Sequence, residues 1–124
     1  VRDLDEIVVW SRSDATLDRF EDGRGPRRAC IGPLSLAHAL VALLEQPALP
    51  RVLNLAQPGL VAMEDILGAA GQPFAWQPAP PAALPALALD LSRLLALAPL
   101  PPATATSLVE EARQGGWRPQ GERP

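Results

Sequence analysis

Two adjacent arginines, Arg27 and Arg28, follow a glycine-containing turn in the sequence DGRGPRR, which begins at Asp22. A guanidinium can donate two parallel hydrogen bonds to a phosphate or a carboxylate, and glycine lets the backbone approach a ligand closely. The same residues could instead form a solvated hairpin in which the arginines pair with Glu21 or Asp22, a contact of small energetic value. The pattern therefore indicates a candidate binding site for an anionic group.

Four further side chains have functional chemistry, and we interpret each against a structural role. Asn54 lies in the apolar run RVLNLA, where a buried amide must find hydrogen-bond partners, so it either fixes a loop or contacts a substrate. His38 has no second histidine to join it in a metal site, and we interpret it as structural. Cys30 is expected to be a small buried side chain on a strand, and Asp90 to begin a helix rather than to act as an acid or base.

The strands that would position these side chains are short. The run DEIVVW, residues 5–10, and the run RVLNLA, residues 51–56, each predict a strand, the second one buried. Between them, residues 17–31 contain Asp-Gly and Gly-Pro pairs and predict either a hairpin or two short extended pieces. Residues 72–89 are rich in proline, which predicts an extended connection.

Helices are expected in four places. Residues 34–46 carry no charge before Glu45 and follow Gly32-Pro33, which predicts a helix that is buried between two layers. Residues 61–71 predict a second helix that ends at a glycine, and residues 91–97 a short third one after Asp90. The spacing of Ser107 and Glu110 is typical of a capping box and predicts the last helix. This order of strands and helices predicts an α/β fold.

Composition excludes several classes of protein. All eleven basic residues are arginine and the chain has no tyrosine, so it cannot supply a Tyr/Lys acid–base pair, a lysine Schiff base or a P-loop lysine. A net charge of −3 argues against a nucleic-acid partner, because that role needs a basic face. The single cysteine excludes an intrachain disulfide. We therefore expect a small-molecule or protein partner.

The length of 124 residues predicts one domain, which we place at residues 1–113, followed by a frayed tail at residues 114–124. The first residue is Val1 and the only methionine is Met63, which indicates a piece of a longer protein. No signal peptide or long apolar run is visible, so we expect a cytoplasmic location and no membrane partner. The three tryptophans, Trp10, Trp76 and Trp117, are too scattered for a stacking platform and are expected in the core or at an interface.

Three blocks of the sequence, in the same order, resemble the NAD-dependent epimerase/dehydratase family of extended short-chain dehydrogenases. DGRGPRRACIGPLSLAHAL is similar to the family's DGxGxR[DS][YF]IxVxDLAxA segment, and RVLNLAQPGLVAMEDIL to its VYNLGxGxxxSxxEL segment. LPALALDLSRLLAL is similar to its LPAxxADxSKAxxLLGW block, with Leu84, Pro85, Asp90 and Ser92 in register. The resemblance covers roughly residues 20–97.

The resemblance implies that this chain is the helix-rich, substrate-binding C-terminal part of such an enzyme, without the Rossmann half that binds the dinucleotide. In the family, the glycine-rich cofactor loop and the Tyr-x-x-x-Lys pair precede this region, so the chain alone binds no cofactor and is not catalytic. NAD or NADP is implied for the complete enzyme, and the missing N-terminal half is the implied partner. An apolar helix at residues 34–44 would also permit a homodimer if it were exposed.

The resemblance places Arg28 on the family's arginine that contacts the phosphates of a nucleotide-sugar substrate, and an alternative alignment places Arg27 there. A second family arginine, just before the Leu-Pro pair, is replaced by APPAA in this chain. The implied substrate is therefore a nucleotide sugar or a related hydroxy or keto compound, bound by Arg28, Arg27 and Asn54. The alternative function is a non-catalytic interaction or structural module derived from the same fold.

Overall fold

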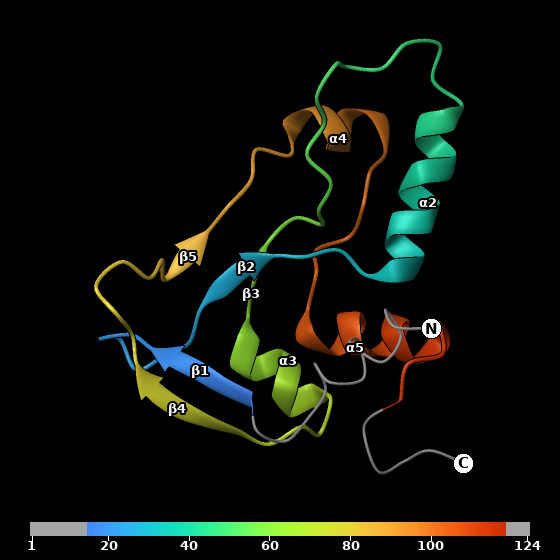
Figure 1. Cartoon of the computed structure of the whole chain (residues 1–124). Helices are drawn as coiled ribbons and strands as arrows, with labels where there is room; N and C mark the ends of the chain where they lie inside the picture. The colour runs from blue at the N-terminus through green and yellow to red at the C-terminus, as the bar shows by residue number, and fades with distance from the viewer. Residues whose placement is uncertain (1–14, 119–124) are drawn as a thin grey trace, which may run out of the picture.

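The computed structural model of the chain describes residues 15–118, which form a mixed α/β fold with short strands and four helices (Figure 1). The predicted α/β class is confirmed. The strand expected at residues 5–10, together with Trp10 and the end of the tail, lies outside the described residues. Within residues 15–118, none of the helices has both the length and the apolar character needed to cross a membrane.

The strands form two small sheets. In the first, β1 (Ala15–Arg19) pairs in parallel with β4 (Phe74–Pro78). In the second, β2 (Arg27–Ala29) is the central strand, with β3 (Leu60–Ala62) antiparallel on one side and β5 (Ala86–Leu87) parallel on the other. Each sheet therefore joins segments that are distant in the sequence.

This pairing decides between the two predictions for residues 17–31. β1 and β2 are consecutive but belong to different sheets, so they are two short extended pieces rather than a hairpin. The proline-rich residues 72–89, expected as an extended connection, contain β4 and β5. Both strands lie at an edge of their sheet, where proline costs no ladder hydrogen bond.

The first helix, α2 (Pro33–Leu44), begins where the sequence predicts, with Gly32 as the N-cap and proline in the first turn. The prediction that it is buried between two layers is wrong for its outer face. Ala39 and Leu43 are buried, but Val41 is 59% exposed and Leu44 83% exposed. The described residues cover one side of α2 only.

The second predicted helix, at residues 61–71, is shorter than expected. Its first two residues belong to β3, and the helix itself is α3 (Met63–Ala69). Gly71 follows with a φ of +70°, a conformation that favours glycine and ends the helix as predicted.

The two remaining helices differ in how well their starts were predicted. Asp90 caps α4 (Ser92–Leu97), since its Oδ1 accepts hydrogen bonds from Ser92 N at 3.0 Å and Ser92 Oγ at 2.7 Å. The capping box of α5 (Ala105–Gln114) lies three residues earlier than expected, because Thr104 is the N-cap and Ser107 is its partner. Thr104 and Ser107 both carry a hydroxyl that can cap a helix. Thr104 is the N-cap because the helix begins at Ala105.

Residues 51–56 were predicted as a buried strand, and this prediction is wrong. No described strand lies beside the segment, and it runs without regular structure between α2 and β3. Its apolar sequence has the strand pattern, but a strand exists only where a neighbour supplies hydrogen bonds.

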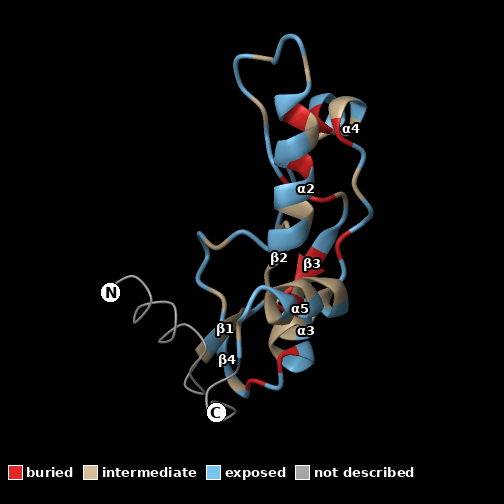
Figure 2. Ribbon diagram, turned by 90° about the vertical axis from the view of Figure 1, so that its right-hand side faces the viewer, coloured by how far each residue is buried: buried red, intermediate tan, exposed pale blue. Residues whose placement is uncertain are grey.

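The core is small and lies between α2, α4 and residues 51–56. Its buried members are Ala39 and Leu43 from α2 with Leu94 and Ala98 from the α4 region, and Leu53 packs against them. Figure 2 shows buried residues concentrated on one side of α2 and around α4 and β3, while much of the remaining surface is exposed. Two of the four buried side chains are alanine, so this core buries only a modest apolar area.

The beginning of α2 is held by two polar side chains from distant parts of the chain. Glu111 of α5 accepts hydrogen bonds from Ser35 N at 2.6 Å and Ser35 Oγ at 2.7 Å. Gln57 is 1% exposed; its Oε1 accepts from Gly32 N at 2.9 Å, and its Nε2 donates to the Pro101 carbonyl at 3.2 Å. These bonds satisfy backbone groups that a helix start leaves unpaired.

Replacing Glu111 tests this arrangement. Glu111→Ala should lower the free energy of unfolding by about 2 kcal/mol, because it removes two charge-assisted hydrogen bonds at the positive end of the helix dipole. Urea denaturation followed by circular dichroism measures the change. Glu110→Ala is the matched control: Glu110 is exposed and bonds only Gln114 of the same helix, so its loss should cost no more than about 0.5 kcal/mol. Equal losses for the two variants would contradict the role of Glu111.

Candidate functional site

The candidate site begins with the turn that joins β1 to β2. Gly23 N donates to the Phe20 carbonyl at 2.9 Å, and Phe20 N donates to the Arg24 carbonyl at 2.9 Å. Gly23 has a φ of +80°, which a residue with a side chain rarely adopts. Asp22 Oδ1 accepts from Arg24 N at 2.9 Å, so the DGRG sequence forms a compact loop with its own hydrogen bonds.

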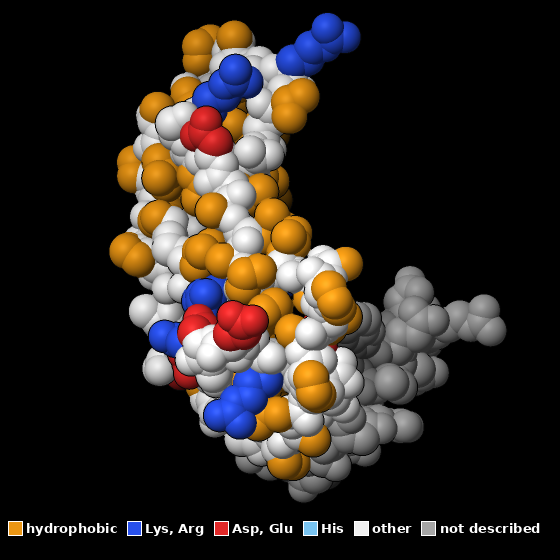
Figure 3. All heavy atoms as spheres, turned by 90° about the vertical axis from the view of Figure 1, so that its left-hand side faces the viewer, with side chains coloured by type: hydrophobic (Ala, Val, Ile, Leu, Met, Phe, Trp, Pro, Cys, Tyr) orange, Lys and Arg blue, Asp and Glu red, His pale blue; other side chains and the backbone are white. Residues whose placement is uncertain are grey.

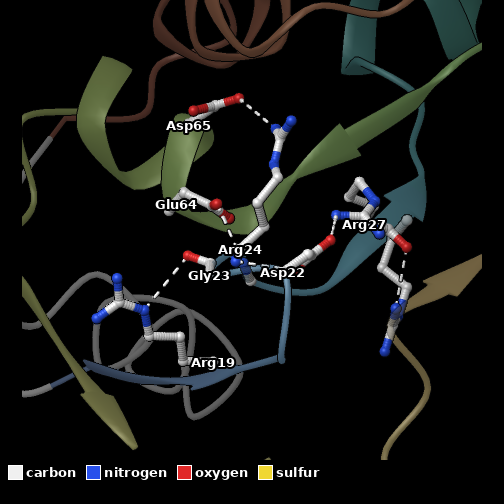
Figure 4. A network of polar contacts seen from close by, with 9 residues as sticks. Arg19, Asp22, Gly23, Arg24, Arg27, Glu64 and Asp65 are labelled. Carbon is white, nitrogen blue, oxygen red and sulfur yellow. Dashed lines mark hydrogen bonds and ion pairs between the residues drawn. The ribbon is translucent and has the colours of Figure 1, made fainter.

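This turn is anchored to the first turn of α3 (Figure 4). Gly25 N donates to Glu64 Oε2 at 3.1 Å, and Met63 N donates to the Pro26 carbonyl at 2.9 Å. An exposed ion pair joins Arg24 to Asp65 at 3.8 Å. Gly25 itself is buried, so the turn is fixed in position rather than free in solvent.

Two arginines reach back over the turn from its two ends. Arg19, the last residue of β1, donates from Nε to the Gly23 carbonyl at 3.3 Å, and its guanidinium lies 5.5 Å from the centre of the Trp76 ring. Arg27, the first residue of β2, donates from Nη1 to Asp22 Oδ2 at 3.2 Å. Figure 4 shows Asp22 and Gly23 between these two arginine side chains.

Both arginines line a groove of about 620 Å³. One wall is the end of β1 and the turn, and the other is the proline-rich segment after β4. Two backbone hydrogen bonds hold the walls together: Ala79 N donates to the Arg19 carbonyl at 3.2 Å, and Arg27 N donates to the Pro85 carbonyl at 2.9 Å. The lining residues are Arg19, Phe20, Glu21, Asp22, Arg27, Pro78, Ala79, Pro80, Pro81, Ala83 and Pro85.

The charged side chains that line the groove are two arginines, Arg19 and Arg27, and two carboxylates, Glu21 and Asp22. A hydrogen bond from the backbone of Arg24, with contributions from the nearby Arg27, lowers the pKa of Asp22, so this carboxylate is charged near neutral pH. The lining contains no histidine, cysteine, lysine or tyrosine. Two guanidiniums beside an apolar proline wall can hold a small molecule that carries an anionic group.

Of the three substrate-binding residues predicted from the sequence, Arg27 alone lines this groove. Arg28 is the next residue of β2 and therefore points to the opposite face of the sheet. Its Nη1 donates to the carbonyl of Arg27 at 2.9 Å. Asn54 is exposed and donates from Nδ2 to the Asp90 carbonyl at 3.1 Å, which ties residues 51–56 to the start of α4. The structure does not bring the three together.

Cys30 was expected to be a buried side chain on a strand, but it lies just after β2 and is only partly buried. Burial raises the pKa of the Cys30 thiol, which stays protonated near neutral pH, and its Sγ donates to the Arg28 carbonyl at 3.6 Å. His38 lies on the exposed side of α2, in a separate shallow hollow with Leu34 and Glu111. Hydrogen bonds from Ser92 lower the pKa of Asp90, as suits a helix cap.

Of the two described tryptophans, which were expected in the core or at an interface, Trp76 is 37% exposed and does not belong to the core, whereas Trp117 is partly buried. Trp76 on β4 packs edge-on against Phe74 with 5.1 Å between ring centres, and the Arg19 guanidinium lies over its ring. Trp117 lines a small apolar pocket with Ile66 of α3 and Val109 of α5. In residues 15–118, no group of three His, Cys, Asp or Glu side chains is placed to hold a metal ion.

Comparison with known proteins gave no match to a family model, to a curated protein or to a solved structure. The function is therefore inferred from the geometry of the groove and from the sequence.

Arg19 and the proline-rich wall of the groove were not predicted from the sequence. Arg19 lies three residues before Asp22-Gly23, so a strand leading into that turn would have placed it at the turn's base. The proline wall depends on the parallel pairing of β1 with β4, which joins residues far apart in the sequence. No local pattern indicates such a pairing.

The packing of the turn can be tested at Gly25. A Cβ at this position would lie 2.6 Å from Glu64 Oε1 and 3.2 Å from the Trp76 ring, so Gly25→Ala should lower the free energy of unfolding by about 1–3 kcal/mol. Gly68→Ala is the matched control, because Gly68 lies in α3 with nothing within 4 Å of its added Cβ. That variant should raise stability by up to about 1 kcal/mol. Thermal denaturation distinguishes the two, and a stabilised Gly25→Ala protein would contradict the close contact.

The Asp22 carboxylate gives a pH-dependent prediction. A lowered pKa in the folded state stabilises the fold at pH values above the pKa of the unfolded chain, and this contribution disappears as pH falls through the folded pKa. The difference in unfolding free energy between the wild type and Asp22→Asn should therefore be constant above about pH 5 and shrink below about pH 4. Urea denaturation of both proteins from pH 7 to pH 3 measures it. A difference that grows on acidification would contradict the lowered pKa.

Proposed function

We propose that this chain is the substrate-binding part of an NAD(P)-dependent epimerase, dehydratase or reductase that acts on a nucleotide sugar or a related hydroxy or keto compound. The observation that carries the proposal is the groove in which Arg27 stands beside the Asp22-Gly23 turn. This is the turn through which the sequence resembles the family, and the resemblance implies a phosphate-contacting arginine at Arg27 or Arg28. Because Arg27 lines the groove and Arg28 does not, the geometry favours Arg27 as the phosphate-contacting arginine.

The dinucleotide would be held by another part of the enzyme. A pyrophosphate commonly binds at a helix start that follows a strand and a glycine-rich turn. Here α2 follows β2 through Gly32, but the Glu111 carboxylate already bonds the backbone of its first turn. Among residues 15–118, this helix start therefore does not fit the cofactor, and in the full enzyme the role of the chain is to bind and orient the substrate.

Binding of an anion requires Arg27 to exchange its partner. Asp22 is half-exposed, and an ion pair between solvated side chains contributes about 0–1 kcal/mol. A phosphate or carboxylate that accepts two parallel hydrogen bonds from the guanidinium can therefore displace Asp22 at small cost. Arg19 lies at the other end of the turn and offers a second positive charge to the same groove.

Titration with inorganic pyrophosphate tests the anion site. Arg27→Ala should weaken binding about tenfold, the equivalent of about 1.4 kcal/mol for a charge-assisted hydrogen bond, and Asp22→Asn should strengthen it by freeing Arg27. Isothermal titration calorimetry or amide chemical shifts at low salt measure both changes.

Two further arginine variants serve as a control and as a test of the alternative alignment. Arg93→Ala is the control, because Arg93 is exposed on α4 and does not line the groove. Arg28→Ala distinguishes the two alignments: a tenfold loss there, with Arg27→Ala unchanged, would assign the anion to Arg28. Equal affinity in all three arginine variants would remove the basis for an anion site.

A second candidate function is a non-catalytic interaction or structural module of the same fold. The observation that favours it is the amount of exposed apolar surface, which includes Val41 and Leu44 of α2 and Val52 in the following segment. Figure 3 shows apolar side chains spread over the face that it presents, with the charged groups confined to a few places. Binding of NAD or NADP by the complete gene product distinguishes the enzyme from the module.

A further inference from the structure

Arg19 is an arginine of the groove that no described carboxylate neutralises. Among residues 15–118, no carboxylate forms an ion pair with its guanidinium. The guanidinium contacts neutral groups instead: Nε donates to the Gly23 carbonyl at 3.3 Å, and the centre of the Trp76 ring lies 5.5 Å away. The side chain therefore brings an uncompensated positive charge to the groove.

The Arg19 side chain can change partners while its backbone stays in place. The backbone is paired with β4, since its carbonyl accepts from Ala79 N at 3.2 Å and its partner in the sheet is Pro78. By contrast, the bond from Nε to Gly23 is longer than most N–H···O hydrogen bonds, and the residue is exposed. In the part of the chain that the structure describes, Nη1 and Nη2 donate no hydrogen bond, so both are available to a ligand.

Arg19 and Arg27 approach the same turn from its two ends (Figure 4). Arg19 bonds Gly23, and Arg27 bonds the preceding residue, Asp22. The Cα atoms of adjacent residues are about 3.8 Å apart, so the two guanidiniums reach neighbouring points of the turn. Both side chains line the groove. A small molecule that lies in the groove can therefore contact the two arginines at once.

A ligand with a single anionic group can use only one of these arginines at a time. At Arg27 it must first displace Asp22, and the carboxylate of Glu21 in the same groove opposes any anion. A ligand with two anionic groups contacts both arginines, and the gain at Arg19 offsets the displacement of Asp22. Each charge-assisted hydrogen bond is worth about tenfold in affinity, so the groove should discriminate between the two kinds of ligand by about that factor.

We propose that Arg19 is a second ligand-binding residue and that the groove takes a ligand with two anionic groups, one at each arginine. The proline wall, which includes Pro80 and Pro81, then packs against the uncharged part of the ligand. A diphosphate and a dicarboxylate share this chemistry, and binding measurements distinguish them. The Arg27 half of the pair rests on the proposed function.

Isothermal titration calorimetry at low salt tests the pair with matched probes: inorganic phosphate against pyrophosphate, and acetate against succinate. In at least one of these comparisons, the two-anion probe should bind about tenfold more tightly than the single-anion probe. Arg19→Gln should weaken binding of that two-anion probe about tenfold and of the single-anion probe by no more than about twofold, since Arg27 remains. Arg93→Gln is the control, because Arg93 is exposed on α4 and does not line the groove.

Arg19→Lys separates ligand binding from packing on Trp76. Lysine keeps a cation beside the ring, so this variant should fold like the wild type. It lacks the planar fork that donates two parallel hydrogen bonds to one anionic group, so the preference for the two-anion probe should still fall, by about threefold. A wild-type preference in Arg19→Lys would mean that Arg19 acts only through Trp76 and would overturn its binding role.

The outcomes separate the role of Arg19 from the proposed function. If Arg27→Ala weakens binding of the preferred probe and Arg19→Gln does not, the second residue is overturned while the anion site at Arg27 stands. If both variants weaken it and the probe is pyrophosphate, both proposals are supported. If both weaken it and the probe is succinate, the two-anion groove is supported and a nucleotide sugar is overturned as the substrate. Equal binding of single-anion and two-anion probes overturns the role of Arg19, and binding of no probe overturns both proposals.

Discussion

Glu111 and Gln57 both bond to the backbone at the beginning of α2, and three parts of the chain meet there. Glu111 brings α5 to the first turn of the helix, while Gln57 ties it to the Pro101 carbonyl and, through its own N–H, to the Cys30 carbonyl after β2. A helix start carries partial positive charge and unpaired N–H groups, which a carboxylate and an amide oxygen both satisfy. With a core rich in alanine, this polar junction determines how α2 and α5 lie relative to the sheet.

The groove depends on a different set of contacts, which explains how it can be rigid on a small fold. Its two walls are joined by backbone hydrogen bonds at Arg19 and at Arg27, and its turn is fixed to α3 through Gly25 and Glu64. Backbone bonds position the walls without relying on side-chain packing. The charged groups that a ligand would meet are half-exposed and paired weakly with each other, so they can change partners while the walls stay in place.

Local sequence patterns correctly predicted the helix starts and stops that depend on neighbouring residues. The start of α2 at Gly32-Pro33, its uncharged character, the cap at Asp90 and the stop at Gly71 were all found, because each depends on neighbouring residues. The pairing of β1 with β4 and the position of Arg19 were not, since they depend on residues about sixty positions apart. The strand prediction for residues 51–56 is wrong for a third reason: their side chains have a strand pattern, but a strand also needs a neighbouring strand to supply hydrogen bonds.

The wrong strand prediction at residues 51–56 has a physical cause in the contacts of that segment. A wrong strand prediction normally means that tertiary contacts override a weak local preference. Here the described contacts of the segment come from its side chains: Leu53 packs against the core, Asn54 Nδ2 donates to the Asp90 carbonyl and Ala56 is buried, while Val52 is 69% exposed. The segment is therefore held in place by its side chains rather than by a ladder of backbone hydrogen bonds.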